Sequence, residues 1–407
     1  MYPRLSNLVS EFPRQFWVLF GGTLVNGIGS GMVFPFLTLY LYQHLAISMT
    51  YVGALLAVWF GSSLVGGLIG GSLSDQFGRK RLMALSLLLG ALLIPLFGLA
   101  DSLFSALGII MAAGVSTAMY QPARDAMIAD LVEQDKRAQA YSLIRIVSNL
   151  GIAIGPAVGG FLASRSYMLS FLLCAAASFV FFVAVLTLTQ ETQPLTRSAH
   201  ARQAGVGGLA NVLHDGLFVL FCLALAVTTI AYAPMMTVLP VYMKEQFALG
   251  ETFFGWVMTT NAGLVVLLQY PITRATARFF RFGLIAAGSV LYGLGIASVW
   301  LGTKFPHFVL AMAVMTMGEM LVSPNMVAVT ADLAPSSLRG SYMGVLGLVV
   351  SVGFGLGPLI GGVINDQVAP RAVWPMMGLT AIAVALVYLL IGRRMVPLRA
   401  ARTTLSA

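Results

Sequence analysis

The sequence Gly71-Ser72-Leu73-Ser74-Asp75-Gln76-Phe77-Gly78-Arg79-Lys80 lies between two long apolar stretches and decides how the rest of the chain is interpreted. It contains an acid, a glycine suited to a tight turn and, together with Arg81, three consecutive cations. Charge of this density between hydrophobic segments is typical of a short cytoplasmic loop in a membrane protein. The stretch therefore sets the expected orientation of every other segment.

The composition is that of a polytopic membrane protein. Of 407 residues, 58% are hydrophobic and only 9% are charged, with 43 glycines and 21 methionines, far from the range of soluble globular chains. The net charge of +9 does not require a nucleic-acid partner, because the lysines and arginines follow the positive-inside rule. All lie on the side of the loop at 71–80 except two within apolar stretches (Arg124 and Arg145) and four on the opposite side (Arg165, Lys244, Lys304 and Arg371).

Twelve apolar stretches are long enough to cross a bilayer, for which about 20 residues are needed. They lie at 16–42, 51–73, 82–100, 104–129, 139–163, 168–189, 216–242, 252–272, 283–302, 308–331, 340–363 and 372–392. The chain is thus expected to be a multi-pass protein of the cell membrane. Because the number of spans is even, both termini are expected in the cytoplasm, with an arginine-rich tail at 393–407.

The two halves of the chain repeat one another. The polar stretch at 190–215 indicates a cytoplasmic linker between a six-helix bundle at 1–189 and a second at 216–392. A single offset of 202 residues aligns many positions without gaps, as expected of an internal repeat. The aligned pairs include Tyr40 with Tyr242, Pro122 with Pro324, Asp130 with Asp332 and Arg137 with Arg339. The sequence predicts an all-α integral membrane protein, and duplicated bundles of this kind are typical of transporters.

The stretch at 71–80 resembles the signature of the major facilitator superfamily between its second and third helices, G-x-L-x-D-x-x-G-R-K, at every fixed position. The resemblance covers the whole chain, and it implies the major facilitator fold and a transporter, not an enzyme. A second signature, G-x-x-x-G-P-x-x-G-G, resembles that of the 12-helix drug:proton antiporter branch. It comprises Gly151, Gly155, Pro156, Gly159 and Gly160, and recurs at Gly353, Gly357, Pro358, Gly361 and Gly362. The alternative is that these glycines serve only the close packing of helices.

Glu319 stands alone about halfway along the tenth span, with no cation within four residues of it. An ionisable group at such a depth is costly and is a functional candidate by default. Because burial disfavours the charged form of a carboxyl, this group is suited to binding and releasing protons. The resemblance to multidrug exporters with an acid in the tenth helix implies proton coupling and cation binding. The alternative is a protonated glutamate that hydrogen-bonds a neighbouring helix for packing.

Three further charged residues, Arg124, Asp125 and Arg145, lie within spans near their expected cytoplasmic ends. Adjacent positions on a helix point about 100° apart, so Arg124 and Asp125 are not expected to face one partner. We expect Arg124 or Arg145 to face the substrate cavity. Asp125 would be the counter-ion through a neighbouring helix and a second candidate for proton coupling. A structural ion pair between the fourth and fifth helices is the alternative.

Asp75, Arg79 and Asp130 form a candidate cytoplasmic gate, because Asp75 closes the second span, Asp130 closes the fourth, and Arg79 can reach either. Within the superfamily such a set resembles a latch that holds the halves together while the cavity faces outward, and that must break in the inward state. The same resemblance assigns Gly71, Gly78 and Lys80 to the gate, with Asp332 and Arg339 as matching candidates in the second half. The alternative is a solvated charged loop that only fixes topology.

By analogy with the superfamily, the first, fourth, seventh and tenth helices line the cavity. Besides Arg124 and Glu319, these helices carry Asn26, Tyr232, Met235, Met236 and Met315. Methionine and aromatic side chains adapt to varied apolar ligands. Each of them could equally pack against a helix or face lipid.

These features predict a proton-coupled secondary transporter that exports drugs or other amphipathic small molecules by alternating access. We expect it to use the proton gradient without a cofactor, to have no metal site and to work as a monomer in the lipid bilayer. The absence of a G-x-x-x-x-G-K-[ST] loop argues against an ATP-driven pump. The alternatives are a transporter of one metabolite, such as a sugar, a siderophore or a lipid, and a sensor that keeps the fold without transport.

Overall fold

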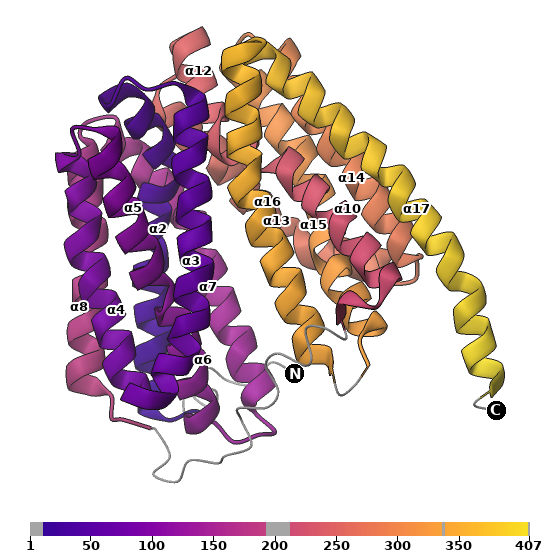
Figure 1. Cartoon of the computed structure of the whole chain (residues 1–407), viewed down its shortest axis with the longest axis horizontal. Coiled ribbons are helices and arrows are strands. Elements are labelled where there is room, and N and C mark those ends of the chain that lie inside the picture. Colours follow the sequence, from indigo (N-terminus) through magenta and orange to yellow (C-terminus); the bar gives the residue numbers. More distant parts are fainter. Residues whose placement is uncertain (1–10, 193–211, 336–337, 406–407) are drawn as a thin grey trace. The chain divides into compact units, whose positions relative to one another are not determined.

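The computed structural model describes residues 11–192, 212–335 and 338–405 (Figure 1). Among these residues, twelve helical spans are long and apolar enough to cross a membrane, as predicted. Most of the linker predicted at 190–215 lies outside the described residues. Large apolar side chains such as Leu68, Phe104 and Leu267 are exposed, which suits a surface surrounded by lipid. The chain is an all-α, multi-pass membrane protein.

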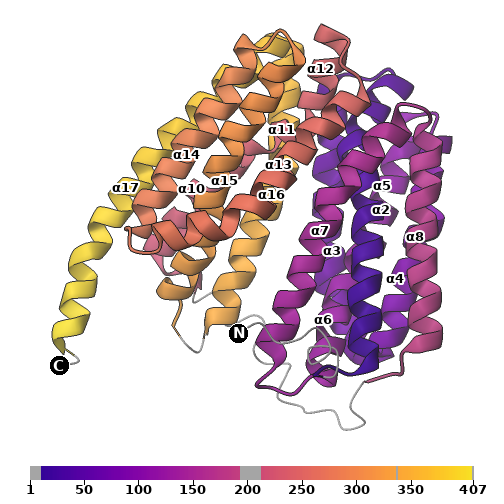
Figure 2. The same ribbon diagram turned by 180° about the vertical axis from the view of Figure 1, so that it is seen from behind.

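Unit 1 comprises Met1–Ile47, Val58–Arg197 and Gly250–Thr259. In it, α2 packs against α7 and α8, and α4 packs against α6 and α8; Figure 2 shows α2 between α7 and α8. One span consists of two helices, α5 and α6, which meet near Pro122, a residue without a backbone N–H to continue the helix. The helices are α2 Arg14–His44, α3 Met49–Phe77, α4 Arg79–Leu93, α5 Leu103–Ala118, α6 Tyr120–Leu131, α7 Arg137–Ala163 and α8 Tyr167–Leu188.

Unit 2 comprises Ser48–Ala57, Ser198–Leu249 and Thr260–Ala407. In it, α10 packs against α16 and α17, and α14 packs against α15 and α17, which is drawn in yellow in Figure 1. The helices are α10 Gly216–Tyr232, α11 Pro234–Thr237, α12 Leu239–Phe247, α13 Glu251–Thr276, α14 Arg281–Ser298, α15 Phe305–Leu333, α16 Arg339–Gln367 and α17 Val373–Leu405.

The two units repeat the same internal arrangement. Helices α4 and α14 begin at Arg79 and Arg281, and helices α7 and α16 begin at Arg137 and Arg339. Both pairs of starts are separated by the offset of 202 residues found in the sequence. The neighbours correspond as well, because α2 with α7 in unit 1 matches α10 with α16 in unit 2. The predicted internal repeat is therefore present in the structure.

The first turns of α3 and α13 do not group with the bundles predicted for them. Residues Ser48–Ala57 belong to unit 2, where the Asp366 carboxylate accepts hydrogen bonds from the backbone N–H of Met49 at 3.3 Å and of Thr50 at 2.7 Å. Residues Gly250–Thr259 belong to unit 1, where the Tyr167 hydroxyl donates to Glu251. Each of these two helices thus contributes residues to both units.

The last helix extends beyond the predicted apolar span. Residues 393–405, expected in the cytoplasmic tail, are helical, because α17 continues without interruption to Leu405. The segment is rich in arginine, alanine and leucine, which favour helix, and α17 continues through Pro397 although proline lacks a backbone N–H.

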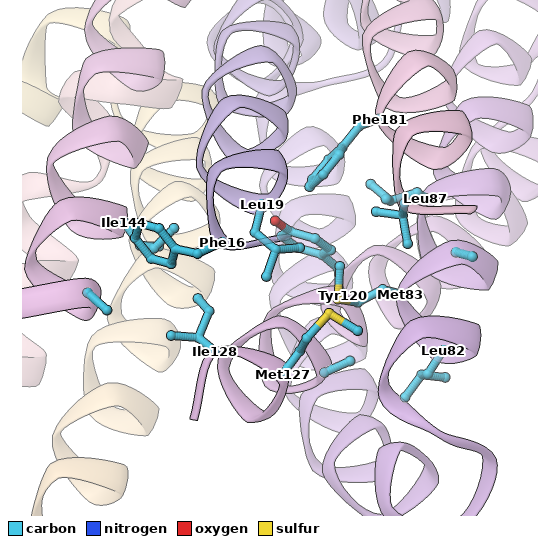
Figure 3. Packing of buried hydrophobic residues seen from close by; sticks show 14 of the residues in the cluster. Phe16, Leu19, Leu82, Met83, Leu87, Tyr120, Met127, Ile128, Ile144 and Phe181 are labelled. Atoms are coloured by element: carbon cyan, nitrogen blue, oxygen red, sulfur yellow. The ribbon is translucent and has the colours of Figure 1, made fainter. Parts of the chain in front are cut away.

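A hydrophobic cluster holds unit 1 together around Phe16 of α2 and Tyr120 of α6 (Figure 3). The Tyr120 ring packs edge-on against Phe181 of α8 at a centroid distance of 5.6 Å. The Tyr120 hydroxyl shares a hydrogen bond of 2.9 Å with Thr23 Oγ1. The cluster thus joins α2, α6 and α8 through apolar packing and one buried polar contact.

The glycine face of α7 packs against the backbone of α2. A Cβ added at Gly151 would lie 2.9 Å from the Cα of Gly27, and one at Gly155 would lie 2.5 Å from the Cα of Gly31. Helix packing, the alternative raised for this signature, is therefore present, and the antiporter label stays a prediction. A Cβ would likewise come within 3.1 Å of a neighbouring segment at Gly159, Gly160, Gly353, Gly357, Gly361 and Gly362.

Candidate functional site

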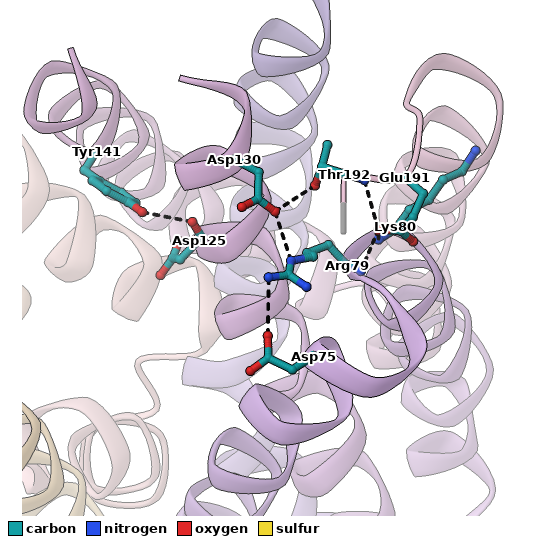
Figure 4. A network of polar contacts seen from close by, with 8 residues as sticks. All are labelled: Asp75, Arg79, Lys80, Asp125, Asp130, Tyr141, Glu191 and Thr192. Atoms are coloured by element: carbon teal, nitrogen blue, oxygen red, sulfur yellow. Dashed lines mark hydrogen bonds and ion pairs between the residues drawn. The ribbon is translucent and has the colours of Figure 1, made fainter. Parts of the chain in front are cut away.

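The charged loop between α3 and α4 forms a polar network within unit 1 (Figure 4). The Arg79 guanidinium lies 3.3 Å from the Asp75 carboxylate and 3.0 Å from that of Asp130. Asp75 lies in the last turn of α3 and Asp130 in the last turn of α6, so Arg79 joins the ends of two helices. The expected three-residue set is therefore assembled, with the Arg79 side chain only 11% exposed.

Glu191, which the sequence analysis missed, completes this network. Its carboxylate accepts hydrogen bonds from the backbone N–H of Arg79 at 2.8 Å and of Lys80 at 3.4 Å, so it caps the N-terminus of α4. The Lys80 ammonium donates to the carbonyls of Leu186 and Thr189 at the end of α8. A glutamate in a polar linker gave no signal in the sequence, because such residues are usually solvated.

Gly78 has a backbone φ of 99°, a conformation that favours glycine. A Cβ at this position would also lie 2.3 Å from Glu191 Oε2. We expect Gly78→Ala to lower the unfolding temperature of the purified protein, because the strain alone costs about 1–3 kcal/mol. Gly71→Ala is the matched control, since a Cβ at Gly71 meets nothing within 4 Å. Equal unfolding temperatures for the two variants would contradict this role of Gly78.

Unit 2 holds the counterpart of one of these ion pairs. Arg281 at the start of α14 pairs with Asp332 near the end of α15, and both residues lie 202 positions after Arg79 and Asp130. Asp332, one of the two matching candidates in the second half, thus pairs with Arg281. The Arg281 side chain is 44% exposed, and Ala277 occupies the position that corresponds to Asp75. The second pair is thus more open to solvent and lacks one carboxylate.

Arg124 and Asp125 form an ion pair with each other, contrary to the prediction. The Arg124 guanidinium lies 2.8 Å from the Asp125 carboxylate, on the same helix. A long arginine side chain can bend back to its neighbour, so the angle between adjacent Cα–Cβ bonds did not decide the contact. Arg124 is also buried, 5.3 Å from the centre of the Tyr120 ring, whereas Arg145 is exposed. Among the described residues, neither the expected counter-ion through a neighbouring helix nor the pair between helices is found.

Glu319 lies within unit 2, half-buried on α15, and its carboxylate accepts a hydrogen bond from the Asn261 amide of α13 at 2.7 Å. Two tyrosines, Tyr232 of α10 and Tyr292 of α14, lie close enough to interact electrostatically with its charge. The rings of these tyrosines pack at a centroid distance of 5.3 Å, and Phe354 of α16 packs edge-on against Tyr232 at 5.7 Å. A single carboxylate thus lies within electrostatic reach of an aromatic cluster.

The remaining cavity candidates divide into packed and half-buried residues. Met235 and Met315 are fully buried, and Met315 packs against Gly295 of α14. We therefore assign these two residues to packing in this structure. Asn26 is half-buried and accepts a hydrogen bond of 2.9 Å from Ser178 of α8. Met236 and Tyr232 are half-buried as well.

The chain consists of two units of repeated membrane-spanning helices. One unit has a charged loop between two helices, and the other has a partly buried carboxylate. Together these features define a polytopic membrane transporter. The family model described as Major Facilitator Superfamily matches residues 19–244 and 221–405. The chain therefore belongs to the major facilitator superfamily, as the resemblance of the loop at 71–80 implied.

The chain is similar to other transporters over most of their length. An uncharacterised transporter of this type, YqjV of Bacillus subtilis, is 26% identical over 86% of both chains. A Na+, Li+, K+/H+ antiporter of Planococcus maritimus is 28% identical over 86% of this chain and 89% of its own. The multidrug resistance protein MdtH of Escherichia coli is 25% identical over 96% of both chains. The solved nucleoside transporter NupG has the same fold, with a TM-score of 0.78 over 92% of this chain and 98% of its own at 14% identity.

Proposed function

We propose that the chain is a proton-coupled exporter of cationic, amphipathic small molecules. The observation that carries the proposal is the Glu319 carboxylate within electrostatic reach of the packed pair Tyr232 and Tyr292. A carboxylate attracts a positive charge, and aromatic faces bind both cations and apolar groups. The similarity to a multidrug resistance protein over 96% of both chains supports this substrate class.

Exchange follows if Glu319 binds either a proton or the substrate cation. The ionised carboxylate would attract a cation from the cytoplasmic side or the inner leaflet, and a proton from outside would then remove that attraction. Because the binding of one weakens the binding of the other, each step prepares the next. The Arg79 network would act as the latch, since its ion pairs have to form and break as access to the site alternates.

Ethidium efflux from cells that express the wild type or Glu319→Gln tests the proposal. We expect protonophore-sensitive efflux from the wild type and a fall to the rate of non-expressing cells in Glu319→Gln. Glu133→Gln is the matched control, because the Glu133 side chain is 76% exposed. Full protonophore-sensitive efflux by Glu319→Gln would reject the coupling role. No efflux by the wild type would favour the transport of a single metabolite.

A second candidate is exchange of alkali cations for protons. Two oxygens, Glu319 Oε2 and Thr316 Oγ1, lie 2.7 and 3.0 Å from the same Asn261 nitrogen, and oxygen donors suit hard cations. The antiporter of Planococcus maritimus is named for such an exchange. In everted vesicles with a preformed pH gradient, added Na+ or K+ would dissipate the gradient in the wild type but not in Glu319→Gln.

A further inference from the structure

Asn261 is the polar residue through which α13 contacts the candidate site. Its side-chain amide donates to Glu319 Oε2 at 2.7 Å and to Thr316 Oγ1 at 3.0 Å. Both partners lie on α15, one turn apart, and all three residues belong to unit 2. The sequence analysis gave this asparagine no role.

The orientation of the Asn261 amide follows from its partners. The Thr316 hydroxyl has one proton, which it donates to the carbonyl of Met312 at 2.7 Å, so it can only accept from Asn261. An amide turned the other way would place its oxygen against this hydroxyl oxygen and against the carboxylate. Thr316 thus holds the NH2 group of Asn261 toward Glu319.

In the described part of the chain, the Asn261 amide is the hydrogen-bond donor to the Glu319 carboxylate. Among the described residues, no lysine or arginine forms an ion pair with Glu319, and Asn261 is the residue that hydrogen-bonds its carboxylate. The titratable groups that interact electrostatically with it are the phenols of Tyr232 on α10 and Tyr292 on α14. A donor to a carboxylate favours the charged form, and hydrogen bonds to charged groups are the strong ones.

We propose that Asn261 is the positioning residue that keeps Glu319 ionised and correctly aimed until a substrate cation or a proton arrives. Oε2 stays engaged as the acceptor of the amide N–H, so an arriving proton binds the other oxygen, Oε1. The inference deepens the proposed function and rests on it for the consequence in transport. Without Asn261, Glu319 would bind a proton too readily, and a substrate cation would compete poorly with the proton for the carboxylate.

Carbodiimide labelling of Glu319 tests this role, because the reagent modifies protonated carboxyls and its product is read by mass spectrometry without any transport. Purified wild type and Asn261→Leu are labelled across a range of pH values. Leucine has a similar size but no hydrogen-bond donor. We therefore expect the midpoint of Glu319 labelling in Asn261→Leu to lie roughly one pH unit higher than in the wild type. Asn261→Gln, which restores an amide, should return the midpoint toward the wild-type value.

An unchanged midpoint in folded Asn261→Leu would overturn the inference. If the leucine variant does not fold, Thr316→Val replaces it, because valine keeps the volume but no longer holds the amide in place. A folded Thr316→Val with a wild-type midpoint would equally overturn the inference. An upward shift in a protein that exports no ethidium would support the role of Asn261 and reject the proposed substrate class, so the two failures are distinguishable.

Discussion

Substitution of Gly155 by leucine is expected to abolish the folded form of unit 1. A Cβ at Gly155 would lie 2.5 Å from the Cα and 2.7 Å from the carbonyl carbon of Gly31. Both are backbone atoms, so the clash can be relieved only if α2 moves away from α7. Helices in lipid associate mainly through close van der Waals contact and gain little from the hydrophobic effect, so separation removes the main attraction between them.

Size-exclusion chromatography of detergent extracts measures this effect. Gly155→Ala, which adds one methyl group, is expected to stay folded with a loss of about 1–3 kcal/mol in stability and a lower unfolding temperature. Gly155→Leu is expected to leave no monodisperse peak. Gly21→Leu, on the partner helix α2, is the matched control, since a Cβ at Gly21 meets nothing within 4 Å. A monodisperse Gly155→Leu protein with wild-type stability would show that the contact between α2 and α7 is not needed.

The fold could be predicted because its signals are local or repeated. Each span is an apolar run of bilayer length, and the offset of 202 residues correctly relates the starts of α4 and α14. The grouping of the first turns of α3 and α13 could not be predicted in this way. It depends on contacts between segments far apart in the chain, such as that of Thr50 with Asp366.

The candidate site was less predictable, because it depends on the rotation of each helix about its axis. A helix in lipid is apolar toward both its neighbours and the bilayer, so the sequence does not reveal which face is buried. Met315, expected at a cavity, is fully buried and packs against α14 in this structure. Asn261 was missed for the same reason, because its partner Glu319 lies 58 residues away in the chain.

The two halves differ in how much of the ion-pair network could be found. The sequence predicted that Arg79 could reach either Asp75 or Asp130, and the structure contains both contacts. The pair of Arg281 and Asp332 lies at the same offset, although Ala277 stands at the position that corresponds to Asp75. A repeat therefore has to be compared position by position, even where one copy has lost part of a signature.

Removal of the Arg79 guanidinium is expected to have the largest effect on transport among the loop residues. Arg79→Ala would leave the carboxylates of Asp75 and Asp130 without their common cation at the ends of α3 and α6. Hydrogen bonds to charged groups that are partly buried contribute about 1.5–3 kcal/mol, and 1.4 kcal/mol corresponds to a factor of ten. Ethidium efflux per folded transporter should therefore fall at least about tenfold.

Arg281→Ala is the matched control within the chain, because it removes the corresponding cation from a pair that is more exposed and has one carboxylate fewer. Exposed ion pairs contribute only about 0–1 kcal/mol, so efflux should change by less than about fivefold. Equal losses in the two variants would mean that the network around Arg79 has no special part in transport.

Arg79→Lys separates the latch from the effect of charge on topology. Lysine keeps the positive charge that orients the loop, but its ammonium cannot present the planar fork with which arginine lies between Asp75 and Asp130. We expect efflux between those of the wild type and Arg79→Ala, with the orientation unchanged in cysteine-accessibility assays of the loop. Wild-type efflux by Arg79→Lys would mean that charge alone suffices, and that the geometry of the two ion pairs does not govern the alternation of access.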